Sequence, residues 1–395
     1  MSEVNPSLPG WGELIDLLRP AEDLLDLTWN PASDPQRAEL YRQLLMNVAL
    51  GYFLYFQADP DHPDWSPFLN SVFLLQPNPD DTYFLARITG EGVYRITGER
   101  GSVYMLTFTT GARMMGLGST PGQGYDQYDA RDLEIGADGS FEIVLSSERP
   151  PGYTGNWLRL DPRADYIMAR QRSYEWGVER DARLAIERID RFSRKPRPSA
   201  AAIVAEIREL LGGFTPRLTK MWLQFQNALR ARGMINKFEF ADFGDAGAIR
   251  VQRYWQCVFE LQPDEALILE TGIPKVCRYW NVQLNDPLFN AIEYLYCQSS
   301  LNGHQAVMDG DGRFRAVLAL EDPGVPNWLD TGGFTRGTVM GRWYESDTQP
   351  LPTIQRVPLA EVRKHLPVDT LHVTPDEREL LLRARARGGQ LRRRW

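Results

Sequence analysis

Alternating hydrophobic and polar positions are clearest in residues 313–318, which follow a turn. The apolar side chains of Phe314, Ala316 and Leu318 occupy every second position of this run. A period of two is typical of a strand that buries one face. Two Asp-Gly pairs in 309–312 are a hairpin signal, so the segment predicts an antiparallel strand that follows a tight turn.

A weaker copy of residues 311–342 occurs earlier in the chain, at residues 138–170. Both copies contain an Asp-Gly turn, an alternating strand, an Asn-Trp-Leu block and a Met-x-Arg block in the same order. The matching positions are Phe141 and Phe314, Asn156 and Asn327, Trp157 and Trp328, Met168 and Met340, and Arg170 and Arg342. We therefore predict two related β-units.

Short runs rich in β-branched and aromatic residues accompany each copy and are bounded by turn residues. They lie at 82–88, 92–98 and 102–108 in the first unit and at 250–261, 265–272 and 277–285 in the second. This is the pattern of antiparallel strands at short intervals, as in a sandwich or barrel. The blocks 78–81 and 262–265 also resemble each other, and each precedes such a run.

Helical patterns fill much of the remaining chain. Residues 11–57 are predicted to be helical, with Asp34 as an N-cap and Pro35 at the first helical position. Further helices are predicted at 176–192, at 199–211 with Ser199 as cap and Gly212-Gly213 as end, at 215–233, and after Thr374. The run of arginines near the C-terminus, from Arg383 to Arg394, predicts a solvated tail at a helix end.

The predicted fold class is mainly β with helical additions, built from two related antiparallel β-sandwich or jelly-roll-like units. The predicted regions are an N-terminal helical region at 1–64, the first β-unit at 65–175, a helical connector at 176–245, the second β-unit at 246–350 and a C-terminal helical tail at 351–395.

Composition narrows the class of protein. The chain has 395 residues, 43% of them apolar, which suits an ordered protein of two domains. A formal net charge of -8 argues against nucleic acid as a partner. The three cysteines form no C-x-x-C pair, and no secretory signal or uninterrupted apolar run of about 18 residues occurs. We therefore predict a cytoplasmic protein without a membrane span.

Several blocks resemble a known family. Residues 278–282, 300–306 and 322–332 look like the hallmarks of domain-of-unknown-function family 1214, so the resemblance is placed in the carboxy-terminal half. Residues 78–83 and 94–98 look like an amino-terminal half similar to the related family 1254. The resemblance, over roughly 65–345, implies a pair of sandwich or jelly-roll-like domains. It implies no catalytic mechanism.

The common catalytic and cofactor signatures are absent. The sequence contains no G-x-S-x-G, H-E-x-x-H or P-loop, and the Gly-rich segment 111–129 does not fit G-x-G-x-x-G. We therefore predict no cofactor and no metal site.

His304 is the candidate acid/base because it lies in a polar, turn-prone loop beside Asn302 and Gln305. The alternative is a histidine that only ties the loop backbone. Asp322 and Asp286 are candidate catalytic carboxylates, whereas solvated turn carboxylates are the alternative. The remaining candidate ligand-binding residues are Asn285 for polar groups, Arg342 for an anionic group, and Trp280 with Trp328 for the pocket walls.

These last residues also have structural interpretations. Trp328 has a counterpart in the first copy, which favours packing, and Arg342 can equally pair with a carboxylate.

The first hypothesis is a cofactor-independent soluble enzyme, of lyase, isomerase or hydrolase type, acting on a small organic molecule with an apolar or aromatic body. Its pocket would lie at or between the β-units. A small-molecule or carbohydrate-binding protein and a scaffold module are the alternatives, and a homo-oligomer is allowed.

Overall fold

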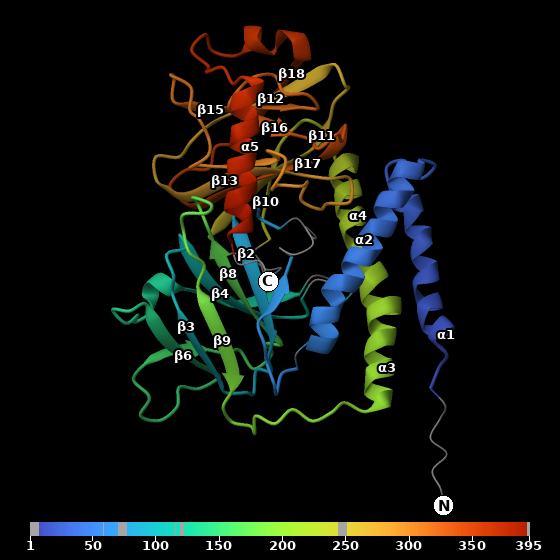
Figure 1. The fold of residues 1–395 in the computed structure, drawn as a ribbon, viewed down its shortest axis with the longest axis vertical. Helices are drawn as coiled ribbons and strands as arrows, with labels where there is room; N and C mark the ends of the chain where they lie inside the picture. The colour runs from blue at the N-terminus through green and yellow to red at the C-terminus, as the bar shows by residue number, and fades with distance from the viewer. Residues whose placement is uncertain are drawn as a thin grey trace, which may run out of the picture.

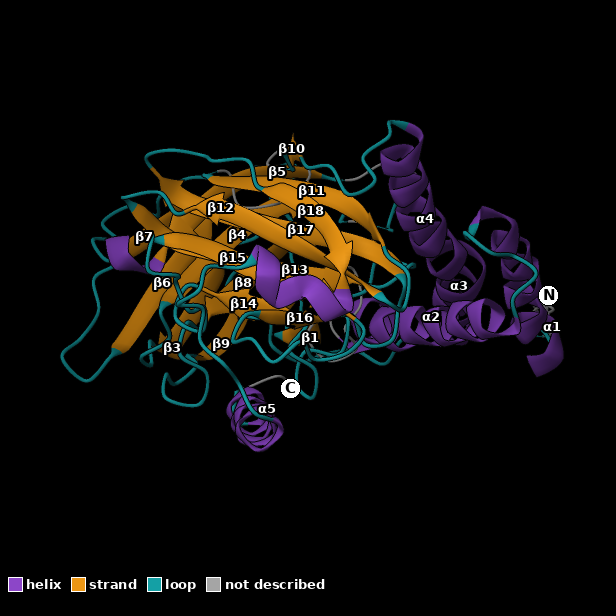
Figure 2. Cartoon of the chain, turned by 90° about the horizontal axis from the view of Figure 1, so that it is seen from above, coloured by secondary structure: helices purple, strands orange, loops and turns teal. Residues whose placement is uncertain are grey.

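The computed structural model describes residues 8–57, 59–69, 77–114, 116–118, 122–243 and 251–392. Two β-units lie one above the other, and a group of helices runs along one side of them (Figure 1). Seen from above, these helices lie to one side of the sheets, and α5 lies on a different side (Figure 2). The predicted fold class, two related β-units with N-terminal helices and a helical connector, is confirmed.

The first unit consists of two packed sheets. A five-stranded sheet has the order β1-β2-β8-β4-β5, and a four-stranded sheet has the order β7-β6-β3-β9. The strands are β1 (Ser66–Phe68), β2 (Asp81–Arg87), β3 (Tyr94–Glu99), β4 (Met105–Ala112), β5 (Gln123–Asp129), β6 (Ser140–Ser146), β7 (Asn156–Arg159), β8 (Tyr166–Arg172) and β9 (Arg183–Arg188).

The second unit repeats this topology strand for strand. Its sheets have the orders β10-β11-β17-β13-β14 and β16-β15-β12-β18. The strands are β10 (Glu239–Ala241), β11 (Gln252–Glu260), β12 (Glu265–Gly272), β13 (Cys277–Asn285), β14 (Ser300–Asn302), β15 (Arg313–Ala319), β16 (Trp328–Asp330), β17 (Arg336–Ser346) and β18 (Thr353–Pro358). In each unit one pair is parallel, β6 with β7 and β15 with β16.

The cross-strand registers match as well. Tyr83 of β2 lies opposite Arg170 of β8, and Tyr254 of β11 lies opposite Arg342 of β17. Because β2 and β11 occupy equivalent places in their sheets, these are equivalent pairs. Identical strand order and register in both halves indicate an internal duplication.

The repeated asparagine makes equivalent hydrogen bonds in the two units. The Asn156 amide donates to the backbone oxygens of Glu134 and Glu142, both at 2.9 Å. Asn327 donates in the same way to the backbone oxygens of Val307 at 2.6 Å and Arg315 at 2.8 Å. Each asparagine therefore fastens the end of a loop to the strand of the alternating segment, β6 or β15.

The core of each unit lies between its two sheets. Along β2, the side chains of Phe84 and Ala86 point inward, and along β11 those of Trp255, Cys257 and Phe259 do so. Successive side chains of a strand point to opposite faces. The intervening residues of the five-stranded sheets therefore face away from the sandwich cores, and these are the residues that build the candidate site.

The helices confirm most of the predicted pattern and correct its details. The N-terminal region contains α1 (Trp11–Ile15), η1 (Asp16–Leu27), α2 (Asp34–Tyr52) and η2 (Phe53–Gln57). The N-cap of α2 is Ser33 rather than Asp34. The connector contains α3 (Ala200–Arg208), η4 (Glu209–Phe214) and α4 (Thr215–Ala231), and Ser199 caps α3 as predicted. Gly212 and Gly213 do not end a helix, because a π-helical turn carries the chain directly into α4.

Two further expectations are wrong. Residues 176–192 contain β9 rather than a helix, because this segment completes the four-stranded sheet beside β3. The blocks 78–81 and 262–265 are not equivalent, since they precede β2 and β12, which occupy different sheets. Within the Gly-rich segment 111–129, residues 123–129 form the strand β5, which pairs with β4.

The C-terminal part contains η6 (Leu359–His365) and α5 (Pro375–Gln390), and Thr374 with Glu377 forms a capping box. The expectation of a solvated arginine tail is wrong for two members: Arg385 is half-buried and Arg392 is buried. Both rest on the ring of Trp176, at 4.6 and 5.3 Å from its centroid. Arg393 and Arg394 lie outside the described residues.

Candidate site between the two five-stranded sheets

The outer faces of the two five-stranded sheets meet in a buried polar layer, which we call the interunit layer. The first unit contributes Asp81, Tyr83, Arg170 and Arg172, and the second contributes Tyr254, Tyr279, Asn281, Gln283 and Arg342. Direct contacts join the two faces. The Asn78 amide donates to the Tyr279 hydroxyl at 2.9 Å, and Arg172 Nη1 donates to Gln252 Oε1 at 3.2 Å.

A buried ion pair lies at one end of this layer. Arg172 binds both carboxylate oxygens of Asp81, at 2.6 and 2.8 Å, and each side chain is only 2% exposed. Burial alone would raise the pKa of Asp81, but the charges of Arg172, Arg342 and Arg170 hold it below its usual value. The guanidinium of Arg172 also lies 4.0 Å from the ring centroid of Tyr279. This pair therefore joins the units, and its carboxylate is already occupied.

Arg342 is a second buried cation with a different environment. It is 3% exposed. Its Nη1 donates to Asn281 Oδ1 at 3.2 Å and to Gln283 Oε1 at 2.6 Å, both neutral acceptors. Among the residues that the structure describes, its Nε and Nη2 have no hydrogen-bond partner, and no carboxylate lies within ion-pair distance. The Nε–Nη2 edge, which can hold a carboxylate with two parallel bonds, is therefore available.

A hydrogen-bond network holds Asn281, and through it Arg342, in place. Asn281 Nδ2 donates to Asn78 Oδ1 at 2.9 Å, and the Asn78 amide in turn contacts the Tyr279 hydroxyl. The Tyr279 hydroxyl donates to Asp80 Oδ2 at 2.5 Å. Burial raises the pKa of Asp80 and raises that of Tyr279 well above its usual value.

An apolar wall lies beside Arg342. The guanidinium is 5.3 Å from the ring centroid of Tyr254, which packs with Phe289 and Met340. Trp222 of α4 packs against this cluster, with its ring 4.8 Å from that of Phe289, and also against the cluster of the first unit that contains Tyr83. The wall therefore joins both units and α4, next to the cation.

His304 lies outside this layer. It is exposed, and its Nε2 is 3.9 Å from Glu175 Oε1 on the surface. The neighbouring Asn302 is buried: its side-chain oxygen accepts from the backbone nitrogens of His304 and Gln305, and its amide donates to Asp80 at 2.7 Å. Gln305 accepts from the Asn302 backbone at 3.3 Å. Asn302, rather than the ring of His304, ties the loop backbone. The acid/base role of His304 stays a prediction.

The two candidate carboxylates are not brought together with His304. Asp322 binds Arg378 of α5 at 2.8 Å. Asp286 accepts from the backbone nitrogens of Leu288 and Asn290 at 2.8 and 2.9 Å, and burial raises its pKa. Asp286 borders a separate cavity of about 470 Å³ between the N-terminal helices and the second unit.

The remaining predicted residues divide between core and layer. Trp280 packs inside the second sandwich, with its ring 4.9 Å from Phe314. Trp328 donates from Nε1 to the Ala319 oxygen at 3.0 Å and packs under η6. Asn285 lies in the layer, where it accepts from Gln283 at 2.8 Å and donates to Thr338 at 3.1 Å. Of the predicted ligand-binding residues, Arg342 and Asn285 lie together.

Sequence reasoning missed Tyr83, Arg172, Tyr279, Asn281 and Gln283. A signal for the last two was present in the strand pattern. Along 277–285 the polar residues at 279, 281, 283 and 285 alternate with the apolar side chains of the sandwich core. A strand that is buried throughout but polar at every second position predicts a polar layer on its second face.

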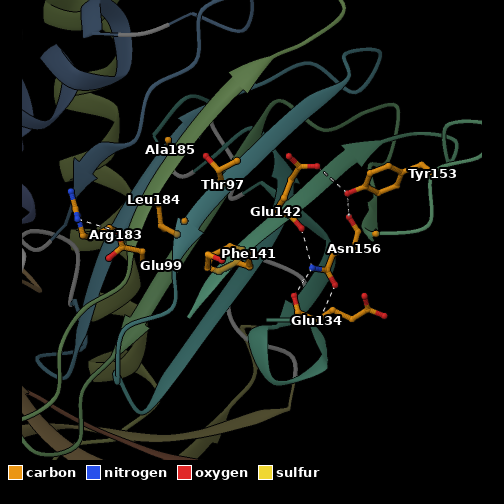
Figure 3. Close-up of a pocket in the computed structure, with 13 residues that line it drawn as sticks. Thr97, Glu99, Glu134, Phe141, Glu142, Tyr153, Asn156, Arg183, Leu184 and Ala185 are labelled. Atoms are coloured by element: carbon orange, nitrogen blue, oxygen red, sulfur yellow. Dashed lines mark hydrogen bonds and ion pairs between the residues drawn. The ribbon is translucent and has the colours of Figure 1, made fainter. Parts of the chain in front are cut away.

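A hollow of about 890 Å³ lies on the outer face of the four-stranded sheet of the first unit (Figure 3). Asn156, Glu142 and Tyr153 lie at one end of it and Arg183 and Glu99 at the other. Asn156 uses its amide to fasten the loop, and Arg183 binds Glu99 at 3.2 Å. These groups already have partners, so we do not place the site here.

Two general findings complete the description. In the described ranges, no three His, Cys, Asp or Glu side chains are grouped so that they could hold a metal ion. Among the helices within those ranges, none is both long enough and apolar enough to cross a membrane.

The fold and the layer define the class: a duplicated β-sandwich protein with a buried polar layer between its halves. The model of the family described as Protein of unknown function (DUF1214) matches residues 86–175. This match lies in the first unit, so the resemblance is corrected from the carboxy-terminal to the amino-terminal half, and no match to family 1254 is found. Because both units share one topology, motifs of one can be taken for those of the other.

Two solved structures resemble the chain. An uncharacterized protein from Burkholderia cenocepacia matches 89% of this chain and 97% of that one, with 28% identity and a TM-score of 0.79. The VPA0106 protein from Vibrio parahaemolyticus matches 87% of this chain and 100% of that one, but 11% identity and a TM-score of 0.45 carry no argument. No curated protein matches the sequence. These similarities support the fold and leave the function open.

Proposed function

We propose that the protein binds a small organic anion with an apolar or aromatic body in the interunit layer, and that Arg342 holds the anionic group. The observation that carries the proposal is the buried guanidinium of Arg342, whose Nε–Nη2 edge has no partner among the described residues. A bound carboxylate could accept two parallel charge-assisted hydrogen bonds from this edge.

The surroundings of Arg342 fit such a ligand. Tyr254, Phe289, Met340 and Trp222 offer apolar and aromatic surface beside the cation. Both oxygens of the nearby Asp81 carboxylate are bound by Arg172, so Asp81 acts on Arg342 only at a distance and not through a direct ion pair. Ligand sites are typically apolar with a few placed polar groups, and this combination matches that description.

Binding rather than catalysis is the function that the geometry favours. The side chains that contact Arg342 are the amides of Asn281 and Gln283, which do not titrate. An enzyme is the second candidate, and the hydrogen bond of 2.5 Å between Tyr279 and Asp80 favours it, since it joins two titratable groups to the same network. The cytoplasmic location stays a prediction.

Calorimetric titration with three acids, benzoate, phenylacetate and trans-cinnamate, and with their neutral amides, tests the proposal. We expect at least one acid to bind more tightly than its amide. Arg342→Met should weaken acid binding about 30-fold or more, as expected for the loss of about 2 kcal/mol or more from a buried charged contact, and leave amide binding nearly unchanged.

Arg336→Met is the matched control, because Arg336 lies on the same strand, carries the same charge and is exposed. If no acid binds, or if Arg342→Met and Arg336→Met weaken acid binding equally, the proposal is wrong. Conversion of a bound acid by wild type, monitored by chromatography, would support the enzyme, and its loss in Tyr279→Phe would assign the Asp80–Tyr279 pair.

A further inference from the structure

The C-terminal helix α5 and the residue that follows its C-cap present arginines to the β-units. Arg378 and Arg385 lie two turns apart on one face of α5, and Arg392 lies just beyond its last residue, Gln390. Arg378 and Arg385 bind groups of the second unit: Arg378 the Asp322 carboxylate, and Arg385 the Ser300 hydroxyl at 2.6 Å. Arg392 contacts the first unit, so the C-terminal segment joins both units.

Arg392 fixes the backbone of one turn in the first unit. It is 6% exposed. Its Nη1 donates to the Pro79 backbone oxygen at 2.5 Å and its Nη2 to the Asp80 backbone oxygen at 2.6 Å. Among the described residues it has no carboxylate within ion-pair distance, so its role differs from that of an ordinary salt bridge. The guanidinium holds two consecutive carbonyl groups, and with them the turn before β2.

Asn78, at the start of this turn, is connected to Arg342 by hydrogen bonds through Asn281. Asn78 precedes Pro79, and its side-chain oxygen accepts from Asn281 Nδ2 at 2.9 Å. Asn281 Oδ1 then accepts from Arg342 Nη1 at 3.2 Å. All three side chains are at most 3% exposed, so water does not replace these bonds readily. A continuous path of hydrogen bonds and one backbone turn therefore runs from Arg392 to the candidate anion site.

We propose that Arg392 is a positioning residue for the anion site: by holding the turn at 79–80, it keeps Asn78 and Asn281 where they orient the guanidinium of Arg342. The inference rests on the proposed function and adds a role for the C-terminal segment. Arg392 acts through other residues and does not contact the ligand.

The test compares Arg392→Met with Arg387→Met in the full chain, using the same three acids and their amides. Arg387 lies on α5 and is exposed, so its variant controls for lost charge. We expect Arg392→Met to weaken acid binding about tenfold, within the range for residues that act through intermediate contacts. Amide binding should change less than about twofold, because only the acid depends on the orientation of Arg342.

A double-mutant cycle separates positioning from general loosening. In an Arg342→Met background, Arg392→Met should have no further effect on acid binding. Equal loss of acid and amide binding, an undiminished effect in that background, or no effect at all would overturn the inference. If Arg342→Met itself leaves acid binding unchanged, the proposed function fails instead. Arg392→Lys, which keeps the charge but not the two-pronged geometry, replaces the methionine variant if that variant does not fold, and the same outcomes apply.

Discussion

Removing one partner of the Asp81–Arg172 pair should destabilise the protein strongly, whereas removing both should cost much less. Both side chains are 2% exposed and joined by two bonds of 2.6 and 2.8 Å. Breaking a buried ion pair leaves an uncompensated charge and typically costs about 3–5 kcal/mol, whereas apolar replacement of both partners is often nearly neutral.

The structure also predicts that the two single changes differ. Asp81→Leu leaves Arg172 unpaired close to Arg170 and Arg342, which also act on the Asp81 site. We therefore expect a loss of about 5 kcal/mol, at the upper end of the range. Arg172→Met leaves Asp81 near the two remaining cations, so we expect about 3 kcal/mol. The double variant should lose less than either single variant, about 2 kcal/mol or less.

Guanidinium chloride unfolding at pH 7, followed by tryptophan fluorescence and by circular dichroism, measures these losses. Agreement between the two signals shows that the transition can be treated as two-state. The control is Arg183→Met, because Arg183 and Glu99 form an exposed pair, and we expect a loss below about 1 kcal/mol. If Asp81→Leu also loses less than about 1 kcal/mol, or if the single losses simply add in the double variant, the argument is refuted.

The pair should also make stability depend on pH in a defined direction. The pKa of Asp81 is lower in the folded protein than its ordinary value, because the charge of Arg172 and its neighbours outweighs burial. The stabilisation is therefore complete above the unfolded-state pKa of about 3.9 and is lost as the pH falls through the folded pKa. The difference in stability between wild type and the double variant should shrink below about pH 4. If the difference in stability between wild type and the double variant stayed constant down to about pH 2, the lowered pKa of Asp81 in the folded protein would be contradicted.

Three further predictions concern single positions. In Gly341→Ala, the new Cβ would lie 1.9 Å from Cζ2 of Trp255, so thermal unfolding should show a loss of about 2 kcal/mol or more. In Asn327→Ala, three backbone contacts of a loop are lost, and chemical unfolding should show a loss of about 1–3 kcal/mol. In Tyr279→Phe, Asp80 loses a hydrogen-bond donor, and chemical unfolding should show a loss of about 1–3 kcal/mol in the free energy of unfolding. For each of the three variants, a change below about 0.5 kcal/mol would contradict the argument.

The sequence predicts the β-units well because they depend on local pattern. The alternation around Phe314 and the repeated Asn-Trp block follow from strand geometry and from loop chemistry within each unit. The segment 176–192 could not be assigned in this way. Its strand β9 is an edge strand with an exposed, charged face, so the apolar alternation that marks a half-buried strand is weak.

The candidate site could be predicted only in part. The sequence singled out Arg342, which recurs in the repeat, and Asn285, and both lie in the interunit layer, while their ligand-binding roles stay predictions. The contribution of Asn78 and Asp81 depends on how one sheet faces another across more than 200 residues of chain, as in the contact of Asn78 with Asn281, and no local pattern encodes that. His304 was favoured because titratable residues in polar loops are good candidates, but the same loop polarity follows from its exposed position.

Comparison of the two units indicates why an anion site would lie beside Arg342 rather than at the ion pair. At equivalent registers, the first unit has Asp81 opposite Arg172, whereas the second has Gln252 opposite Tyr344. The first unit thus supplies a carboxylate together with an additional arginine, and the two satisfy each other. At the position of Arg170 the second unit keeps an arginine, Arg342. The residues opposite Arg342 and Tyr344 in the neighbouring strands carry amides or hydroxyl groups and no carboxylate. Among the described residues no carboxylate is bound to Arg342, and this is why we propose it, rather than Arg172, as the anion site.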